Sequence, residues 1–487
     1  MTPGITIVGL GPGAPTAMTL EGRAAIDQAA RVCLRTTRHP AGQAIAEQRE
    51  VVSFDELYEQ IDGFEAVYAE IVRRVVAWGE DDVGVVYAVP GDPMVGEATT
   101  GGIRRAAAQR GIPVRLIHAS SFLEPTLAVL GVDALDGLQV ADALVLGDRH
   151  YPPLSPDRPA VIGQVYSRLV ASELKLTLLS QYPPDHSVWL IDAAGSEATR
   201  HNILALVDLD RQDRFSHATS VFVPPLEAPS SFESFQETIA HLRAPDGCPW
   251  DREQTHESLR THLMEEAYET LEAIDSGDPN ALREELGDLL LQIVLHAQIA
   301  SEAGDFTMPE VIAAIEAKII RRHPHVFGEV KVEGVDQVLH NWEGLKADER
   351  NRAGEGRGAL DGVPKTLPAL SQALEVQARA ARLGFDWRTI EGVRAKLAEE
   401  LVELESATDL SRQEDEIGDL LFAVVNLARW LRVDPESALR GCNRRFRRRF
   451  ARMEAQAAAQ GVSLGDLELN ALERLWQEAK RADASEA

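Results

Sequence analysis

Glu265-Glu266-Ala267-Tyr268-Glu269, followed by Glu285-Leu286-Gly287-Asp288, has a second copy in Glu399-Glu400-Leu401-Val402-Glu403 and Glu416-Ile417-Gly418-Asp419. Each copy reads EExxE, then a break, then ExxD. On a helix, spacings of three and four place side chains on one face, so each half predicts a stripe of carboxylates. Two antiparallel helices would bring both stripes together, and such a cluster repels itself unless a hard divalent cation neutralises it. Mg²⁺, which takes oxygen ligands and bridges substrate phosphates, is the natural candidate, so the repeat indicates metal-dependent phosphate chemistry.

The alternative for these runs is an ordinary solvated helix face, which is the usual fate of a single glutamate-rich segment. ExxD alone also suits a helix start, where negative charge is favourable. Both copies, however, lead into apolar helical segments, Leu289–Ala297 and Leu420–Ala428. Because the full pattern occurs twice in this context, it favours a metal site over a solvated face.

The composition excludes several classes of protein. A chain of 487 residues has room for two to four domains. Its net charge of -28 argues against sequence-independent binding to nucleic acid. Cys33, Cys248 and Cys442 are far apart and odd in number, which predicts no disulfide framework and a reducing cytoplasm. We expect no signal peptide, because no basic segment precedes an apolar stretch, and no membrane span, because no uncharged apolar run reaches about 18 residues.

The predicted secondary structure changes near the middle of the chain. Residues 1–225 alternate short buried strands with helices, which predicts an α/β domain with a largely parallel sheet. The predicted strands are Ile5–Leu10, Val83–Val89, Val114–Ile117, Ala143–Leu146 and Val188–Ile191. The predicted helices between them include Glu21–Ala30, Thr99–Arg110 and Thr199–Val207.

Long amphipathic helices dominate after a linker at Pro224–Ser231. A second break, Asn351–Pro364, separates residues 232–350 from residues 365–487, which predicts two duplicated all-α domains rather than a short-period solenoid. The predicted helices are Ser258–Asp275, Ala281–Ala303, Pro309–Arg322, Leu367–Leu383, Val393–Ala407, Gln413–Leu431 and Pro435–Gln460.

Basic groups and a tryptophan follow each acidic pattern in the same order. In the first copy they are Lys318, Arg321, Arg322, Trp342 and Lys346; in the second they are Arg445, Arg448, Arg449, Trp476 and Lys480. Arginine and lysine bind phosphate oxygens, arginine with a bidentate fork, and tryptophan can stack on a base. An arginine run alone is more often a solvated face or a salt-bridge strip, but the repeated order favours a nucleotide site. Pro324 is expected to end the helix after Arg322, so the first site is expected to differ in shape.

This order, with further motifs, resembles the MazG nucleoside triphosphate pyrophosphohydrolases over about residues 232–487. The motifs are Gly247-Cys248-Pro249-Trp250-Asp251, Gln254-Thr255-His256, Leu259, Glu265–Glu269, Arg322-His323-Pro324-His325-Val326-Phe327 and Asn341-Trp342-Glu343. The resemblance implies an all-α, Mg²⁺-dependent enzyme that is typically a homodimer. It also implies hydrolysis of nucleoside triphosphates to monophosphate and diphosphate, with a metal-assisted water attacking the α-phosphorus.

The resemblance implies roles for individual residues. The metal ligands would be Glu400, Glu403, Glu416 and Asp419, and in the first copy Glu266, Glu269, Glu285 and Asp288. Glu399 would position or deprotonate the attacking water. The triphosphate would be neutralised by Arg445, Arg448, Arg449 and Lys480, and Trp476 would contact the nucleoside, with Lys318, Arg321, Arg322, Trp342 and Lys346 as the first-copy counterparts. In the family the C-terminal repeat is usually taken as the main catalytic one.

Three loops of the N-terminal part each follow a predicted strand. They are Gly9-Leu10-Gly11-Pro12-Gly13, Pro90–Ala98 and His118–Phe122. An open α/β sheet binds ligands at the carboxyl ends of its strands, although the first loop is not the dinucleotide fingerprint. In this order the loops resemble the tetrapyrrole (corrin/porphyrin) methylases over about residues 3–224, which implies two α/β lobes and S-adenosylmethionine as cofactor. By similarity the cofactor pocket would be lined by Leu10, Asp92, Val95, Ser120 and Ser121.

The sequence therefore predicts a multidomain cytoplasmic protein: a two-lobed methylase-like α/β domain followed by two all-α MazG-like domains, a fusion of the YabN type. The leading hypothesis is a Mg²⁺-dependent nucleoside triphosphate pyrophosphohydrolase. One alternative is a methyltransferase acting on a tetrapyrrole-like acceptor, alone or in a bifunctional chain. The other is a non-catalytic nucleotide-sensing protein. We expect no nucleic-acid partner and no membrane partner.

Overall fold

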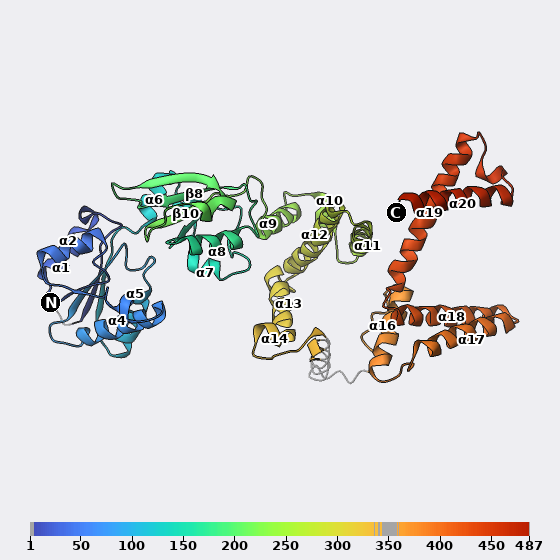
Figure 1. Cartoon of the computed structure of the whole chain (residues 1–487), viewed down its shortest axis with the longest axis horizontal. Helices are drawn as coiled ribbons and strands as arrows, with labels where there is room; N and C mark the ends of the chain where they lie inside the picture. The colour runs from blue at the N-terminus through green and yellow to red at the C-terminus, as the bar shows by residue number, and fades with distance from the viewer. Residues whose placement is uncertain (1–3, 336, 339–340, 343–357, 359, 487) are drawn as a thin grey trace. The chain divides into compact units, whose positions relative to one another are not determined.

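The computed structural model describes residues 4–335, 337–338, 341–342, 358 and 360–486. Its contacts divide the chain into two compact units, Met1–Asp246 and Gly247–Ala487 (Figure 1). The boundaries of the three expected domains, 1–225, 232–350 and 365–487, stay a prediction. None of the described helices combines the length and the hydrophobicity that a membrane span requires.

The first unit begins with a five-stranded sheet in the order β3-β2-β4-β1-β5. Its strands are β1 (Ile5–Gly9), β2 (Val32–Leu34), β3 (Val52–Ser53), β4 (Val85–Val89) and β5 (Val114–Ile117). Every pairing is parallel, so the prediction of a parallel sheet is confirmed for this part. Successive residues of β4 pack into cores on opposite faces of the sheet, because the side chains of a strand point to the two faces in turn. Tyr87 packs with α4 (Phe64–Gly79) and α5 (Ala98–Gln109), whereas Val86 packs with α1 (Leu20–Gln28) and α2 (Pro40–Gln48).

The second sheet of this unit is mixed, which the sequence did not predict. Its strand order is β6-β7-β10-β8-β9, and only β6 and β7 run parallel. The strands are β6 (Gln139–Asp142), β7 (Ala160–Gly163), β8 (Ser187–Asp192), β9 (Arg200–Ala205) and β10 (Thr219–Val223). Helix α8 (Arg168–Leu178) covers one face, and α6 (Leu123–Leu130) covers the other. The prediction of a largely parallel sheet is therefore wrong for this lobe.

Two predicted elements have the opposite structure. The predicted strand Ala143–Leu146 is helix α7 (Ala143–Gly147), because Asp142 accepts a hydrogen bond from the backbone N–H of Leu144 at 2.9 Å and caps it. The predicted helix Thr199–Val207 is mostly strand β9, which pairs with β8 along its whole length. Short apolar runs carry too little periodicity to separate the two states, so the tertiary partner decides.

The predicted linker Pro224–Ser231 contains no helix or strand, and its end is fixed to the second lobe. The carboxylate of Asp157 accepts hydrogen bonds from the backbone N–H groups of Ser230 (2.7 Å) and Ser231 (3.1 Å). Ser231 in turn caps α9 (Phe232–Arg243). Helix α9 therefore belongs with the first unit.

The second unit is entirely helical in the part of the chain that the structure describes. The helices before residue 330 are α10 (Pro249–Glu253), α11 (Arg260–Ser276), α12 (Pro279–Ala303), α13 (Met308–Arg322) and α14 (Pro324–Phe327). Those after residue 365 are α16 (Ala369–Arg382), α17 (Ile390–Ser406), α18 (Leu410–Trp430), α19 (Pro435–Ala459) and α20 (Leu469–Glu486). All seven predicted helices are confirmed to within a few residues at each end, and α13 ends before Pro324 as expected.

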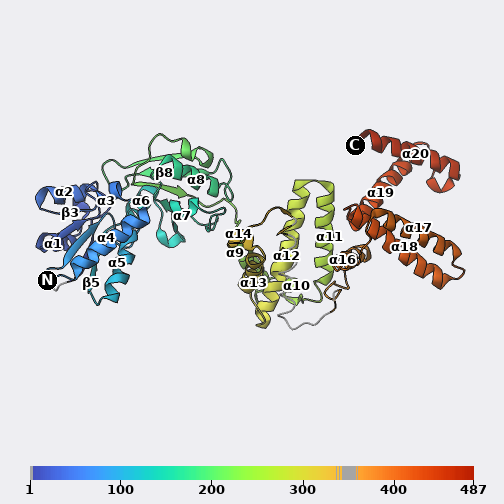
Figure 2. The same ribbon diagram turned by 60° about the horizontal axis from the view of Figure 1, so that its bottom comes forward.

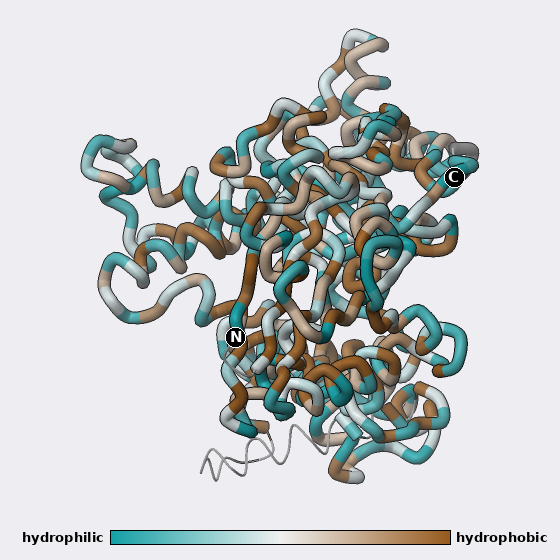
Figure 3. The backbone as a smooth tube through the Cα atoms, turned by 90° about the vertical axis from the view of Figure 1, so that its left-hand side faces the viewer, coloured by the Kyte–Doolittle hydropathy of each residue, from teal (hydrophilic) through white to brown (hydrophobic). Residues whose placement is uncertain are grey.

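Two helical hairpins recur in this unit. Helices α11 and α12 lie side by side, as do α17 and α18 (Figures 1 and 2). The first hairpin turns at Gly277, whose φ of 71° suits glycine, and Asp278 caps the next helix. Large apolar side chains stay exposed on α12 and α18, among them Leu286, Ile293, Leu421 and Phe422. Figure 3 shows hydrophobic and hydrophilic residues alternating along the helical turns, as amphipathic helices require.

Candidate functional site

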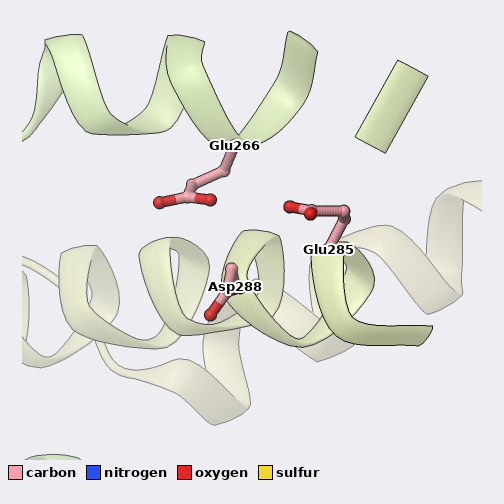
Figure 4. A group of neighbouring side chains, drawn as sticks. All are labelled: Glu266, Glu285 and Asp288. Atoms are coloured by element: carbon pink, nitrogen blue, oxygen red, sulfur yellow. The ribbon is translucent and has the colours of Figure 1, made fainter. Parts of the chain in front are cut away.

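The α11–α12 hairpin gathers the first set of carboxylates. Glu266 stands on α11, and Glu285 and Asp288 stand on α12 (Figure 4). One carboxylate oxygen from each lies within 4.8 Å of the others. The hydroxyl of Thr270 donates to the carbonyl of Glu285 at 3.3 Å, which ties the two helices together beside the group. The predicted convergence of two acidic stripes is therefore present in the first copy.

The α17–α18 hairpin repeats this arrangement with Glu400, Glu416 and Asp419, whose oxygens also lie within 4.8 Å of one another. Glu400 is only 4% exposed, and its Oε2 atom is buried without a hydrogen-bond partner. A buried carboxylate oxygen in this state is costly unless something binds it. The Oε1 atom of Glu400 lies 2.8 Å from the ammonium of Lys396, which sequence reasoning missed although it stands four residues earlier on the same helix.

Burial and mutual repulsion both raise carboxylate pKa values in the two clusters. Burial raises the pKa of Glu266, and the charges of Asp288 and Glu269 raise it further. Burial also raises the pKa of Glu416, together with the charges of Glu403, Glu400 and Asp419. Glu269 and Glu403 lie outside the groups within 4.8 Å, but their charges still act on them. An all-oxygen donor set that disfavours its own ionisation fits a hard cation such as Mg²⁺.

Comparison with known proteins agrees with this geometry. Residues 254–327 match the MazG nucleotide pyrophosphohydrolase domain, residues 368–446 match phosphoribosyl-ATP pyrophosphohydrolase, and residues 4–208 match the tetrapyrrole (corrin/porphyrin) methylases. The chain is 47% identical over 257 residues to the nucleoside triphosphate pyrophosphohydrolase/pyrophosphatase MazG of Thermotoga maritima, covering 53% of this chain and 98% of that protein. The chain belongs to the MazG family.

A relative with a similar length matches nearly the whole chain. This chain is 41% identical over 490 residues to the uncharacterized protein YabN of Bacillus subtilis, covering 98% of this chain and 99% of that protein. Among solved structures, uroporphyrin-III-C-methyltransferase from Thermus thermophilus aligns with a TM-score of 0.37 and 22% identity, covering 46% of this chain and 93% of that one. The match to YabN over nearly the whole chain, together with the MazG and methylase domain matches, confirms the predicted fusion. Membership in the MazG family makes the chain a hydrolase acting on acid anhydrides.

The basic residues of the second MazG repeat have a partner that the sequence did not reveal. Asp483 on α20 is buried and accepts hydrogen bonds from Arg448 Nε at 2.9 Å and Arg449 Nε at 2.8 Å, both on α19. The guanidinium of Arg449 also lies 5.7 Å from the ring centre of Trp476, which packs on Phe446. Trp476, Lys480 and Asp483 share one helix face by their spacing, and this spacing is the signal that could have identified Asp483.

The other predicted phosphate-binding residues are distributed as follows. Arg445 and Lys480 are exposed on α19 and α20. Lys318 and Arg321 are exposed on α13, which ends at Arg322. The ring of Trp342 lies 6.4 Å from that of His323. Lys346 lies outside the described residues.

The three N-terminal loops meet at the carboxyl end of the parallel sheet. Gly11 and Gly91 exchange backbone hydrogen bonds, of 3.2 Å and 2.8 Å, which join the first loop to the second. Asp92 is buried; it accepts hydrogen bonds from the backbone N–H of Met94 at 2.8 Å and of Ala119 at 3.2 Å, which joins the second loop to the third. A Cβ atom on Gly9 would lie 2.6 Å from the carbonyl of Gly91, so glycine is required there.

The remaining predicted cofactor residues lie on or beside these loops. The Leu10 side chain is fully buried in the core between the sheet and α1, so it offers only its backbone. Ser121 is buried and donates to Glu124 through both its backbone N–H and its hydroxyl, each at 2.7 Å. Val95 and Ser120 are half-buried.

Proposed function

We propose that this chain hydrolyses nucleoside triphosphates to monophosphate and diphosphate, and that its carboxylate clusters hold Mg²⁺. The observation that carries the proposal is the second cluster, where Glu400, Glu416 and Asp419 meet and a buried oxygen of Glu400 has no hydrogen-bond partner. The names of the MazG relatives from Thermotoga maritima and Escherichia coli support the substrate class. Bound Mg²⁺ would neutralise charge on the carboxylates and the triphosphate and act as a Lewis acid.

The side chains around the second cluster suggest distinct roles. Glu399 shares the Lys396 ammonium with Glu400, and its side chain is 54% exposed. We propose that its second oxygen orients a water molecule toward the α-phosphorus and accepts the proton. The exposed cations Arg445 and Lys480 would contact phosphate oxygens.

The Asp483 network suggests how the rest of the basic group acts. We propose that Arg448, which Asp483 holds through Nε and Nη2, and Arg449, held through Nε, place their positive charge beside the triphosphate. Trp476 would contact the nucleoside with the part of its ring that stays exposed. In the first repeat, Lys318, Arg321, Arg322 and Trp342 would serve the same purposes.

We further propose that the helical unit forms a homodimer. Apolar side chains exposed on α12 and α18, such as Ile293 and Phe422, would be buried by a second copy. Such burial would supply the main driving force for association. A cytoplasmic location is proposed from the three cysteines, none of which forms a disulfide.

A second proposed function concerns the N-terminal unit. The joined loops at Gly11, Gly91 and Asp92 support binding of S-adenosylmethionine at the carboxyl end of the sheet. Methyl transfer to a tetrapyrrole-like acceptor would follow from positioning rather than from a dedicated acid or base. Binding of S-adenosylhomocysteine to the purified chain tests the first step, and absence of binding would contradict it.

A product assay tests the main proposal. The full chain is incubated with each common NTP and dNTP and Mg²⁺, and the products are separated by ion exchange. We expect monophosphate and diphosphate, with turnover lost in Glu416→Gln but kept in Glu414→Gln, which removes the same charge from an exposed position of the same helix. Nucleoside diphosphate and phosphate as products, or nucleotide binding without turnover, would contradict the proposal.

A further inference from the structure

Lys396 lies one helical turn before the EExxE motif of the second repeat and contacts both of its leading carboxylates. Its Nζ atom lies 2.8 Å from Glu399 Oε1 and 2.8 Å from Glu400 Oε1. Spacings of three and four residues make this double contact possible on one face of α17 (Ile390–Ser406). The ammonium group therefore bridges the proposed water-orienting carboxylate and a proposed metal ligand.

The two ends of this bridge differ in solvent exposure. The side chain of Glu399 is 54% exposed and that of Lys396 is 37% exposed, so their contact alone resembles an ordinary surface pair of small energetic value. The side chain of Glu400 is only 5% exposed. A carboxylate that is buried to this extent needs a partner, because an unpaired buried charge is strongly unfavourable.

The bridge divides the two oxygens of Glu400 between two tasks. Oε1 is held by Lys396, whereas Oε2 is buried without a hydrogen-bond partner. Glu400 also belongs to the group with Glu416 and Asp419 whose ligand oxygens lie within 4.8 Å of one another. Fixing Oε1 restricts the carboxylate to one orientation and leaves Oε2 available to a cation.

The first repeat has a different residue at the corresponding position. His262 stands three residues before Glu265, as Lys396 stands three residues before Glu399. Its Nδ1 atom lies 3.3 Å from Glu265 Oε2, and its ring meets that of Trp250 edge-on at 6.4 Å. The imidazole thus contacts the first acidic residue of the motif, while the longer lysine also holds the second.

We propose that Lys396 is a positioning residue that holds Glu400 in its metal-binding orientation and makes the second cluster the better preorganised of the two. This inference rests on the proposed function, because it concerns the same carboxylates. Partners that orient a metal ligand typically contribute about 10- to 100-fold to metal affinity.

The sign of the effect separates positioning from simple electrostatics. An ammonium beside a cation site repels the cation, so removing it would tighten metal binding if charge alone mattered. If Lys396 acts by orienting Glu400, its removal weakens binding instead. A matched control is Arg394→Met, which removes an exposed positive charge from the same helix and leaves the bridge intact.

The test is a titration of the full-length chain with Mn²⁺, in which free Mn²⁺ is followed by electron paramagnetic resonance. All proteins carry Glu266→Gln and Asp288→Asn, so that the second cluster dominates binding. We expect Lys396→Met to weaken Mn²⁺ binding about 10-fold or more, and Lys396→Arg and Arg394→Met to leave it within about 3-fold. Unchanged or tighter binding in Lys396→Met would overturn the inference.

Two further measurements keep the outcomes distinct. Circular dichroism melts show whether Lys396→Met is folded. Glu399→Gln keeps the contact of Lys396 with Glu400, so we expect it to retain its affinity for Mn²⁺. A loss of affinity in Glu399→Gln as large as that in Lys396→Met would count against the proposed role of Lys396. If the parent chain hydrolyses nucleoside triphosphates but Lys396→Met binds Mn²⁺ as tightly as the parent, only the role of Lys396 is overturned. A chain that binds Mn²⁺ through Lys396-held Glu400 but releases no diphosphate would overturn only the proposed function.

Discussion

Arg448 and Asp483 form a two-point contact between the last two helices, with Nε–Oδ1 at 2.9 Å and Nη2–Oδ2 at 2.8 Å. Arg449 and Arg452 reach the same carboxylate, at 2.8 Å and 3.1 Å. One buried acidic side chain therefore gathers three guanidinium groups on α19. These three arginines are therefore held by an acidic residue of the same chain, whereas Arg445 of the same basic run stays exposed.

The first prediction concerns acid stability through Asp483. Hydrogen bonds from Arg448, and then Arg449, lower the pKa of Asp483 to about 2, even though its burial acts in the opposite direction. A depressed pKa stabilises the fold above the pKa of about 3.9 of an unfolded aspartate, and this stabilisation is lost as the pH falls toward 2. Thermal melts of Asp483→Asn should show a lower Tm at neutral pH and a smaller further loss on acidification than the parent.

Glu478→Gln is the control for that experiment, because Glu478 is exposed on the same helix. Its melting curves should follow those of the parent at every pH. Identical curves for Asp483→Asn and the parent would show that the arginine network does not stabilise the hairpin.

The second prediction concerns metal removal and pH. Burial, followed by the charges of Glu269 and Asp288, raises the pKa of Glu285, and the pKa values of Glu266 and Glu416 are also raised. A raised pKa means that the folded state binds protons more readily than the unfolded state. The contribution of these carboxylates to folding stability is therefore most favourable at low pH and is lost as the pH rises through their folded-state pKa.

We expect burial and repulsion of these carboxylates to lower the stability of the metal-free fold at about pH 7, and part of this stability to return near pH 5. Added Mg²⁺ should therefore raise Tm more at the higher pH than at the lower. Scanning calorimetry with a chelator and with excess Mg²⁺ measures both values. An equal or larger Mg²⁺ effect at the lower pH would be the opposite of this expectation.

The third prediction assigns the chemistry to one repeat. Glu400→Gln should lower the rate of diphosphate release about 100-fold, because it removes a buried carboxylate that we propose as a metal ligand held in place by Lys396. Glu266→Gln makes the matched change in the first repeat and should have a much smaller effect. Steady-state kinetics with saturating Mg²⁺ compare the two, and the reverse ranking would assign turnover to the first repeat.

The fourth prediction concerns the N-terminal loops. Asp92→Asn removes one of the two carboxylate acceptors of Asp92, which hold Met94 within the second loop and join that loop to Ala119 of the third. Losing a buried hydrogen bond to a charged group costs about 1.5–3 kcal/mol, so we expect S-adenosylhomocysteine to bind about 10-fold more weakly. Isothermal titration calorimetry measures the change, with Asp213→Asn as control because its side chain is 97% exposed. Unchanged affinity would mean that these loops do not form the cofactor site.

The sequence predicted the helical unit better than the second lobe. Helices such as α12 and α18 span many turns, so their apolar and acidic positions repeat often enough to identify them. The segment Ala143–Leu146 is too short for that, and its helix depends on the cap from Asp142. Strand β9 exists because β8 offers it an antiparallel edge, which no local pattern records.

The sequence alone determined the family and the fusion of an α/β part to duplicated helices. It also determined the acidic stripes, because a spacing of three or four residues places side chains on one helix face whatever the surroundings. Only the tertiary structure decided which carboxylates converge. It selected Glu400, Glu416 and Asp419, with Glu403 outside the group, and it brought Lys396 to Glu400 and Asp483 to Arg448. Helical periodicity fixes directions along one helix, whereas the distance between side chains of two helices depends on how those helices pack.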